Sequence, residues 1–129
     1  LSMMPHPFAS RRLYYKVALK NDTPYEAIFA KIEYCACADD ENDFIASGGT
    51  WTADYRGGCL VTKIKSTLRL PDGTSFYCLS YFSLGTGLSE FFLMWINDNC
   101  CLRSSEQSNT ECTKQVKDSD SNNAGLIPV

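Results

Sequence analysis

The stretch that most constrains the fold is LVTKIKSTLRL, from Leu60 to Leu70, which alternates residue by residue. Its apolar side chains fall mainly on one face and its basic side chains, Lys63, Lys65 and Arg69, on the other. A period of two predicts a half-buried β-strand. Pro-Asp-Gly at 71–73 follows and predicts a tight turn, because proline presets φ and glycine supplies positive φ. We therefore expect residues 74–84 to return as the partner strand of a hairpin.

Three further stretches predict strands. Residues 13–20 are rich in strand-forming residues, and residues 25–34 place Ile28, Ala30 and Ile32 on one face. A helix competes for 25–34, because Ala, Glu, Lys and Ile all tolerate one. The strong strands elsewhere favour a strand there too. Residues 89–97 are apolar on both faces, which predicts a strand that is central in its sheet or covered by another element.

Strands joined by short Gly, Pro and Asp turns predict an all-β domain, because no segment combines helix caps with a sustained helical period. We expect a small antiparallel β-sandwich, or a partly open barrel, of about six to eight strands. The predicted divisions are an extended N-terminal arm (1–12), the sandwich (13–117) and a C-terminal tail (118–129). The expected core residues are Ile28, Ile32, Leu60, Ile64, Leu68, Phe76, Phe82, Phe91 and Trp95.

Size and charge exclude some classes of function. The 129 residues suit one domain. The net charge is −3, whereas a general nucleic-acid binder normally carries a basic excess, so we expect no nucleic-acid partner. The longest fully apolar run, Phe91 to Ile96, is far shorter than the roughly 20 residues that span a bilayer, so we expect no transmembrane segment.

The seven cysteines indicate an oxidising compartment, and hence a secreted protein with at least two disulfides. The candidates are Cys35, Cys37, Cys59, Cys78, Cys100, Cys101 and Cys112. Their pairing cannot be read from the sequence, and the odd number leaves one thiol free or paired between chains. Zinc is the rival interpretation, but the cysteine spacings do not suit it and His6 is the only histidine. Cys100 and Cys101 are adjacent, so on a strand they point to opposite faces and should bond different partners.

Catalysis finds little support, since a lone histidine in a proline-flanked arm gives no nucleophile–base pair. We expect no enzyme, no cofactor and no bound metal. The loop at 38–44 gathers four acidic residues, Asp39, Asp40, Glu41 and Asp43. Clustered oxygens suit calcium, but the loop lacks the Gly and Glu of an EF-hand, so we interpret it as a solvated acidic loop.

The loop at 48–58 carries the candidate ligand-binding residues Trp51, Tyr55 and Arg56, framed by glycines that permit close approach. Aromatic side chains of this kind stack on sugar rings, so glycans are the candidate ligand. The alternative is that Trp51 fills the core and the glycines only make turns. Separately, Asn21-Asp22-Thr23 matches the N-glycosylation pattern, although Pro24 should reduce its occupancy.

Both ends of the chain are partly apolar, with candidate assembly residues Met3, Met4, Phe8, Leu126, Ile127 and Val129. An extended segment can add to the sheet edge of a neighbour, and a head-to-tail contact that does not close makes a filament. We therefore expect a secreted, non-enzymatic structural subunit of an extracellular fibre or other homo-oligomer. The alternative is a secreted binding module, lectin-like or membrane-active, that uses the loop at 48–58. A third arrangement, in which both ends cover their own domain, stays open.

Overall fold

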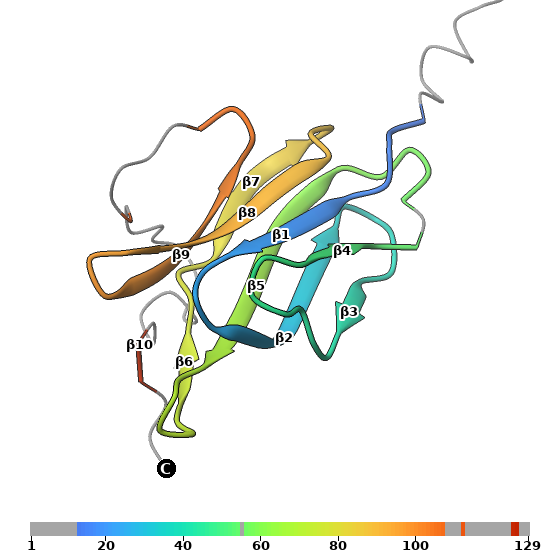
Figure 1. The fold of residues 1–129 in the computed structure, drawn as a ribbon. Coiled ribbons are helices and arrows are strands. Elements are labelled where there is room, and N and C mark those ends of the chain that lie inside the picture. The colour runs from blue at the N-terminus through green and yellow to red at the C-terminus, as the bar shows by residue number, and fades with distance from the viewer. Residues whose placement is uncertain (1–12, 55, 108–111, 113–124, 127–129) are drawn as a thin grey trace, which may run out of the picture.

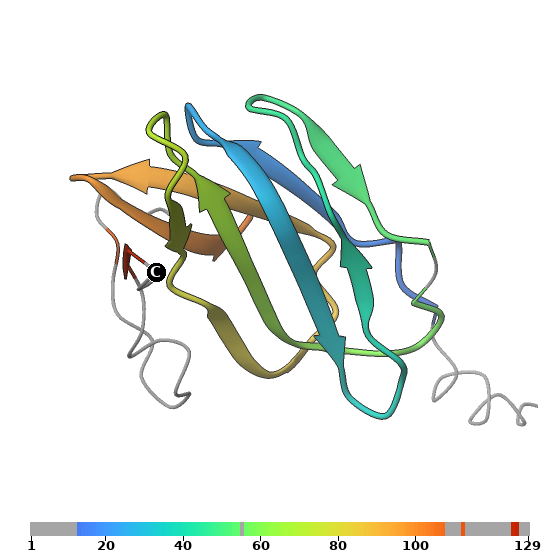
Figure 2. The ribbon, with the colours of Figure 1, turned by 90° about the horizontal axis from the view of Figure 1, so that it is seen from below.

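The structure is a computed structural model that describes residues 13–54, 56–107, 112 and 125–126. The chain forms an all-β sandwich of two mostly antiparallel sheets, stabilised by three disulfides, which confirms the predicted fold class. Figure 1 shows the two layers, and in Figure 2 the strands β2 and β5 run side by side across one of them.

The four-stranded sheet has the order β4-β1-β8-β9. Its strands are β1 (Ala18–Asp22), β4 (Thr50–Thr52), β8 (Glu90–Ile96) and β9 (Asn99–Ser104). Strands β1 and β8 pair in parallel, and the other two pairings are antiparallel. The predicted central position of the doubly apolar strand is confirmed, because β8 lies between β1 and β9. Phe91 and Leu93 point into the core, whereas Phe92 lies outside under the guanidinium of Arg103, 4.3 Å from the ring centroid.

The six-stranded sheet has the order β10-β6-β5-β2-β3, and β7 also pairs with β5. Its strands are β2 (Glu26–Tyr34), β3 (Asp40–Asn42), β5 (Val61–Arg69), β6 (Ser75–Tyr77), β7 (Tyr81–Thr86) and β10 (Gly125–Leu126). Strand β5 therefore has β2 on one side and both β6 and β7 on the other. All pairings in this sheet are antiparallel.

The core lies between the sheets, and the period-two prediction locates much of it. Of the expected core residues, five are buried: Ile32, Ile64, Leu68, Phe76 and Phe91. The other four are half-buried: Ile28, Leu60, Phe82 and Trp95. Trp95 still packs against the core, edge-on to the rings of Tyr25 and Phe76.

Register shifts explain why two of the expected core residues, Ile28 and Leu60, are only half-buried. An irregularity in β2 between Ala27 and Phe29 places Ala27 in the core in place of Ile28. A second irregularity, between Val61 and Lys63, buries Val61 rather than Leu60. A shift of one residue moves a side chain to the opposite face of the sheet, so alternation alone could not assign these positions.

The predicted strand at 74–84 is broken in the structure. Residues 78–80 separate β6 from β7 and cross toward the other sheet, where Cys78 bonds Cys100 and the Leu79 N–H donates to the Cys100 carbonyl at 2.8 Å. A parallel bridge between Leu79 and Cys101 adds to this link. The break leaves a hollow beside β5 that is lined in part by Cys78 and Ser80.

The ends of the chain fall largely outside the described residues. Five of the predicted assembly residues lie there: Met3, Met4, Phe8, Ile127 and Val129. Leu126 belongs to β10, which pairs with β6 of the same chain in the register Gly125–Tyr77 and Leu126–Phe76. The predicted strand at 13–20 is shorter than expected, because β1 begins at Ala18.

Candidate functional site

The candidate ligand-binding loop at 48–58 is built into the sandwich. Trp51 lies on β4 and packs partly buried against the core. Arg56 is only 3% exposed, and Tyr55 lies outside the described residues. Arg56 is therefore buried within the sandwich, and Trp51 mainly packs against the core.

The guanidinium of Arg56 is occupied by backbone carbonyls. Its Nε donates to Cys59 O at 3.0 Å, one terminal nitrogen donates to Leu88 O at 2.7 Å, and the other donates to Thr86 O at 2.9 Å. The Tyr14 ring lies 5.1 Å from the guanidinium carbon. Burial lowers the pKa of Arg56 from its ordinary value. Arg56 thus ties its own loop to the β7–β8 connection.

The acidic stretch at 38–44, predicted as a solvated loop, contains the short strand β3 (Asp40–Asn42), and its acidic side chains pair with side chains of β2. Lys31 Nζ lies 3.3 Å from Asp39 and 4.0 Å from Glu41, and these partners raise the pKa of Lys31, with the Asp39 hydrogen bond as the largest cause. The hydroxyl of Tyr34 donates to Asp40 at 2.7 Å. Within the described residues no group of three or more His, Cys, Asp or Glu side chains is placed to hold a metal ion.

Asn21, the glycosylation candidate, is fully buried. Its amide nitrogen donates to Tyr25 O at 2.8 Å and to Ile45 O at 3.0 Å, while its oxygen accepts from Thr23. A glycan on that nitrogen has no room in this fold. Asn21 instead holds the turn after β1, which is a structural role that the tripeptide pattern does not reveal.

Six of the candidate cysteines form disulfides, namely Cys37–Cys59, Cys78–Cys100 and Cys101–Cys112. The adjacent Cys100 and Cys101 bond different partners. Cys35 is the exposed free cysteine. No membrane-spanning helix occurs in the part of the chain that the structure describes.

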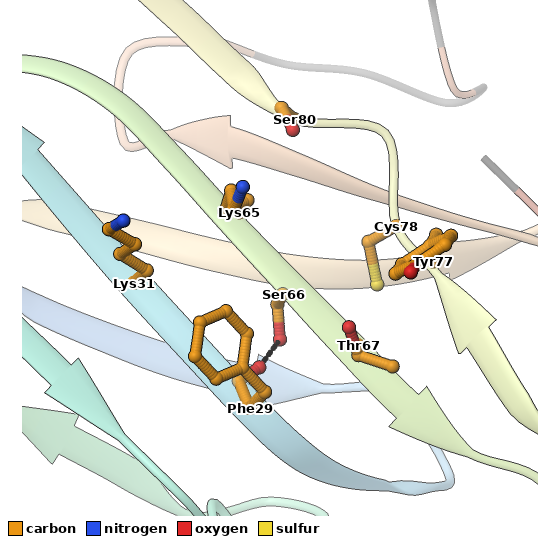
Figure 3. A pocket seen from close by; sticks show the side chains of 8 residues that line it. All are labelled: Phe29, Lys31, Lys65, Ser66, Thr67, Tyr77, Cys78 and Ser80. Atoms are coloured by element: carbon orange, nitrogen blue, oxygen red, sulfur yellow. Dashed lines mark hydrogen bonds between the residues drawn. The ribbon is translucent and has the colours of Figure 1, made fainter. Parts of the chain in front are cut away.

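A pocket of about 360 Å³ lies on the outer face of the six-stranded sheet, beside the break between β6 and β7. Figure 3 shows its side chains projecting from neighbouring strands. It is lined by Phe29, Lys31, Lys65, Ser66, Thr67, Tyr77, Cys78 and Ser80. Its volume falls within the range of roughly 300–1,000 Å³ that is typical of small-molecule sites.

The strand register explains why these side chains meet. Phe29 is opposite Thr67, and Thr67 is opposite Tyr77, so one row across β2, β5 and β6 places a hydroxyl between two aromatic rings. In the next row Lys31 is opposite Lys65. Directly opposite residues have Cβ atoms about 5 Å apart, which brings all five side chains within reach of one small ligand.

Two serines in the pocket differ in their hydrogen bonding. Ser66 Oγ donates to Phe29 O at 2.6 Å, the interaction dashed in Figure 3. Ser80 Oγ is buried and has no hydrogen-bond partner among the described residues. A buried hydroxyl left unsatisfied costs about 1–3 kcal/mol, so a polar group in the pocket that bonded it would be favoured.

Sequence reasoning did not identify this site. The alternation at 60–70 did place Lys63 and Lys65 on a face away from the main apolar one. The sequence does not reveal which strands lie beside β5, nor that the chain leaves the β5 ladder after Cys78, whose N–H still donates to Ser66 O. Both depend on contacts between residues that are distant in the sequence.

Comparison with known proteins bears on the fold alone. No family model matches the chain, and no curated protein sequence matches it. A protein from Eubacterium rectale, whose structure was solved by NMR, is similar over 83% of this chain and 97% of its own, with a TM-score of 0.51 and 13% sequence identity. At that identity the similarity supports the sandwich architecture and says nothing about a ligand.

Proposed function

We propose that this chain is a secreted, non-enzymatic binding protein that holds a carbohydrate in the pocket on the outer face of the six-stranded sheet. The observation that carries the proposal is the cross-strand row Phe29–Thr67–Tyr77. The apolar C–H face of a sugar packs on aromatic rings, while its hydroxyls need nearby hydrogen-bonding groups. Thr67 supplies such a group between the rings, and Ser80 supplies another in the same pocket.

Other features support parts of this proposal. Three disulfides are typical of proteins that mature in an oxidising compartment, which favours secretion. The described residues that line the pocket are two lysines, hydroxyl side chains, two aromatic rings and a disulfide sulfur, and none of these described residues carries a carboxylate or imidazole that could act as an ordinary general base. This composition suits binding better than hydrolysis.

The test is a glycan array followed by calorimetric titration of the sugars that bind. Phe29→Ala should reduce affinity at least about tenfold, because loss of an aromatic platform removes both burial and stacking. Phe44→Ala is the matched control, since Phe44 is exposed, lies outside the pocket, and loses the same atoms. An array without binding, or equal losses in the two variants, would contradict the proposal.

Self-assembly is a second candidate function, supported by β10, a short segment near the end of the chain that adds to one end of a sheet by pairing with β6. The same edge could accept the tail of a neighbouring copy, which would build the head-to-tail fibre or other homo-oligomer expected from the sequence. We propose deletion of residues 124–129 and, separately, of 1–10, with mass measured by light scattering. An oligomer that dissociates on deletion supports assembly. A monomer before and after deletion argues for tails that cover their own domain.

A further inference from the structure

The break between β6 and β7 gives the segment beside β5 one residue more than the ladder can pair. Thr67 is opposite Tyr77 on one side of the break. Ile64 is opposite Tyr81 on the other side. Between these two pairs, two residues of β5 therefore stand against the three residues 78–80. An extra residue of this kind disrupts the ladder locally and redirects a side chain, as a β-bulge does.

Ser80 is the residue of this segment whose hydroxyl is turned toward the pocket. Tyr81, the next residue, points into the core, where its ring centroid lies 5.1 Å from that of Phe91. Successive side chains of an extended strand point to opposite faces, so Ser80 faces the outer side, where it lines the pocket. Figure 3 shows it at the end of the pocket away from Phe29. Ser80 is only 1% exposed, and its hydroxyl has no hydrogen-bond partner among the described residues.

A buried, unpartnered hydroxyl discriminates among the polar groups of a sugar. Ser80 has one hydrogen to donate and two lone pairs that accept. When a sugar hydroxyl meets it, one of the two donates, and the hydrogen of the other needs a further acceptor in an enclosed place. A carbonyl oxygen accepts the serine hydrogen and brings no donor of its own. Because an unsatisfied buried donor is costly, this position favours a carbonyl over a hydroxyl.

The place of Ser80 along β5 sets the length of the group that reaches it. Tyr81 is opposite Ile64, so Ser80, the residue before it, lies beside Lys65. The aromatic row is centred on Thr67, two residues further along β5. A strand rises about 3.3 Å per residue, so the two positions are about 7 Å apart. A hydroxyl extends a sugar ring packed on that row by a single oxygen, whereas an acetamido group extends it by a nitrogen, a carbon and the carbonyl oxygen.

We infer that the sugar held in this pocket is an N-acetylated amino sugar. Its ring packs on the row of Phe29 and Tyr77, and its acetamido carbonyl accepts the hydrogen of the Ser80 hydroxyl. The amide N–H of the same group is then placed to donate to Thr67, which lies between the two rings in the register. This inference rests on the proposed function and names the class of sugar and the residue that selects it.

Two pairs of sugars test the inference, and the members of each pair differ only at the second ring carbon. Methyl N-acetylglucosaminide is compared with methyl glucoside, and methyl N-acetylgalactosaminide with methyl galactoside, by calorimetric titration of the intact protein. In at least one pair the acetamido sugar should bind about tenfold more tightly, which corresponds to about 1.4 kcal/mol. Equal binding within both pairs rejects the inference, while the proposed function stands if the glycan array identifies another sugar.

Ser80→Ala and Ser83→Ala form the matched pair of variants. Both remove one hydroxyl at or next to β7, but Ser80 lines the pocket whereas Ser83 is not among its lining residues and already donates to Val61 O at 2.7 Å. We expect Ser80→Ala to bind the acetamido sugar and the plain sugar about equally, with little change in affinity for the plain sugar. Ser83→Ala should keep the preference for the acetamido sugar.

Each other outcome overturns a defined statement. A preference that survives in Ser80→Ala, or that disappears from both variants, rejects the role of Ser80 and with it the inference. Removal of an unpartnered hydroxyl should leave the fold intact, so a Ser80→Ala chain that unfolds in thermal measurements shows that the hydroxyl is bonded within the protein, which also rejects the inference. Binding of none of the four sugars rejects the inference, and an empty glycan array rejects the proposed function with it.

Discussion

The loop at 48–58 and the outer face of the six-stranded sheet both combine aromatic and cationic side chains, yet the structure uses them differently. In the loop, the Arg56 guanidinium is buried and donates to carbonyls of Cys59, Thr86 and Leu88. On the sheet face, Lys65 and the Phe29 ring line an open pocket. The same residue types therefore stabilise the fold in one region and form a candidate binding site in the other.

The difference follows from where backbone groups find their partners. Connections between strands carry carbonyls outside the ladders, such as those of Cys59 and Leu88, and a buried carbonyl must be satisfied. Arginine, with five N–H donors, meets several of these at once. In a sheet, the ladder satisfies the backbone, so outward side chains are not needed to satisfy it. Composition alone cannot separate the two cases.

The largest expected losses of stability come from removing either of two disulfides that span the same number of residues. Cys37–Cys59 and Cys78–Cys100 each close a loop of 22 residues, so loss of either should cost about 3–4 kcal/mol of unfolding free energy by loop entropy. Only the second holds the segment at 78–80 that borders the pocket. Paired Cys→Ala variants, compared by urea unfolding and sugar titration, should lose similar stability but unequal affinity. Equal losses of affinity in the two variants would contradict the proposal that the sugar binds in this pocket.

Arg56→Ala should have the next largest effect. Its free energy of unfolding should fall by about 2–3 kcal/mol, because several buried carbonyls lose their donor. Arg69→Ala is the control: Arg69 is exposed and donates to Gly73 O at 3.1 Å, so its loss should stay within about 0.5 kcal/mol. Urea unfolding measures both. Affinity for the sugar should change little in either variant, and a selective loss of binding in Arg56→Ala would return the loop to consideration as the site.

Alanine substitutions of the two pocket serines should change the free energy of unfolding by smaller amounts and in opposite directions. Ser66→Ala removes a donor to Phe29 O and should destabilise the fold by about 1 kcal/mol. Ser80→Ala removes a buried hydroxyl that lacks a partner among the described residues, and should leave stability unchanged or raise it by about 1 kcal/mol. Sugar affinity should fall in Ser80→Ala. A stability loss there would mean that the hydroxyl is already bonded in the folded protein.

Particular residues also show which parts of the structure could be predicted from the sequence. Alternation at 60–70 placed Ile64 and Leu68 in the core, and the doubly apolar 89–97 stretch predicted a central strand. The exchange of Ile28 for Ala27 could not be predicted, because a bulge depends on the partner strand. The pocket could not be predicted either, since it needs Tyr77 beside Thr67 and a break at 78–80. Disulfide partners and strand order are relations in space that spacing along the chain leaves open.

The smallest expected effect concerns alkaline pH and the buried end of β2. Burial, and then the hydrogen bond to Asp40, raise the pKa of Tyr34 above the ordinary tyrosine value of about 10. The folded state thus holds this proton more tightly than the unfolded state. Its contribution to stability is complete below pH of about 10 and is lost as pH rises from there toward the folded-state pKa. Between about pH 9.5 and 11, the free energy of unfolding should fall less steeply with pH in Tyr34→Phe than in the unaltered protein. An equal slope in the two proteins would contradict this.

The most direct test of the account is an NMR titration of the labelled protein with a sugar that the glycan array identifies, followed through the backbone amide signals. If the sheet face is the site, shifts should concentrate at residues 29, 31, 65–67 and 77–80, which line or border the pocket. The amides of the loop at 48–58 should change little, because Arg56 is buried there. Shifts confined to residues 48–58 would contradict the central claim that the sheet face holds the ligand.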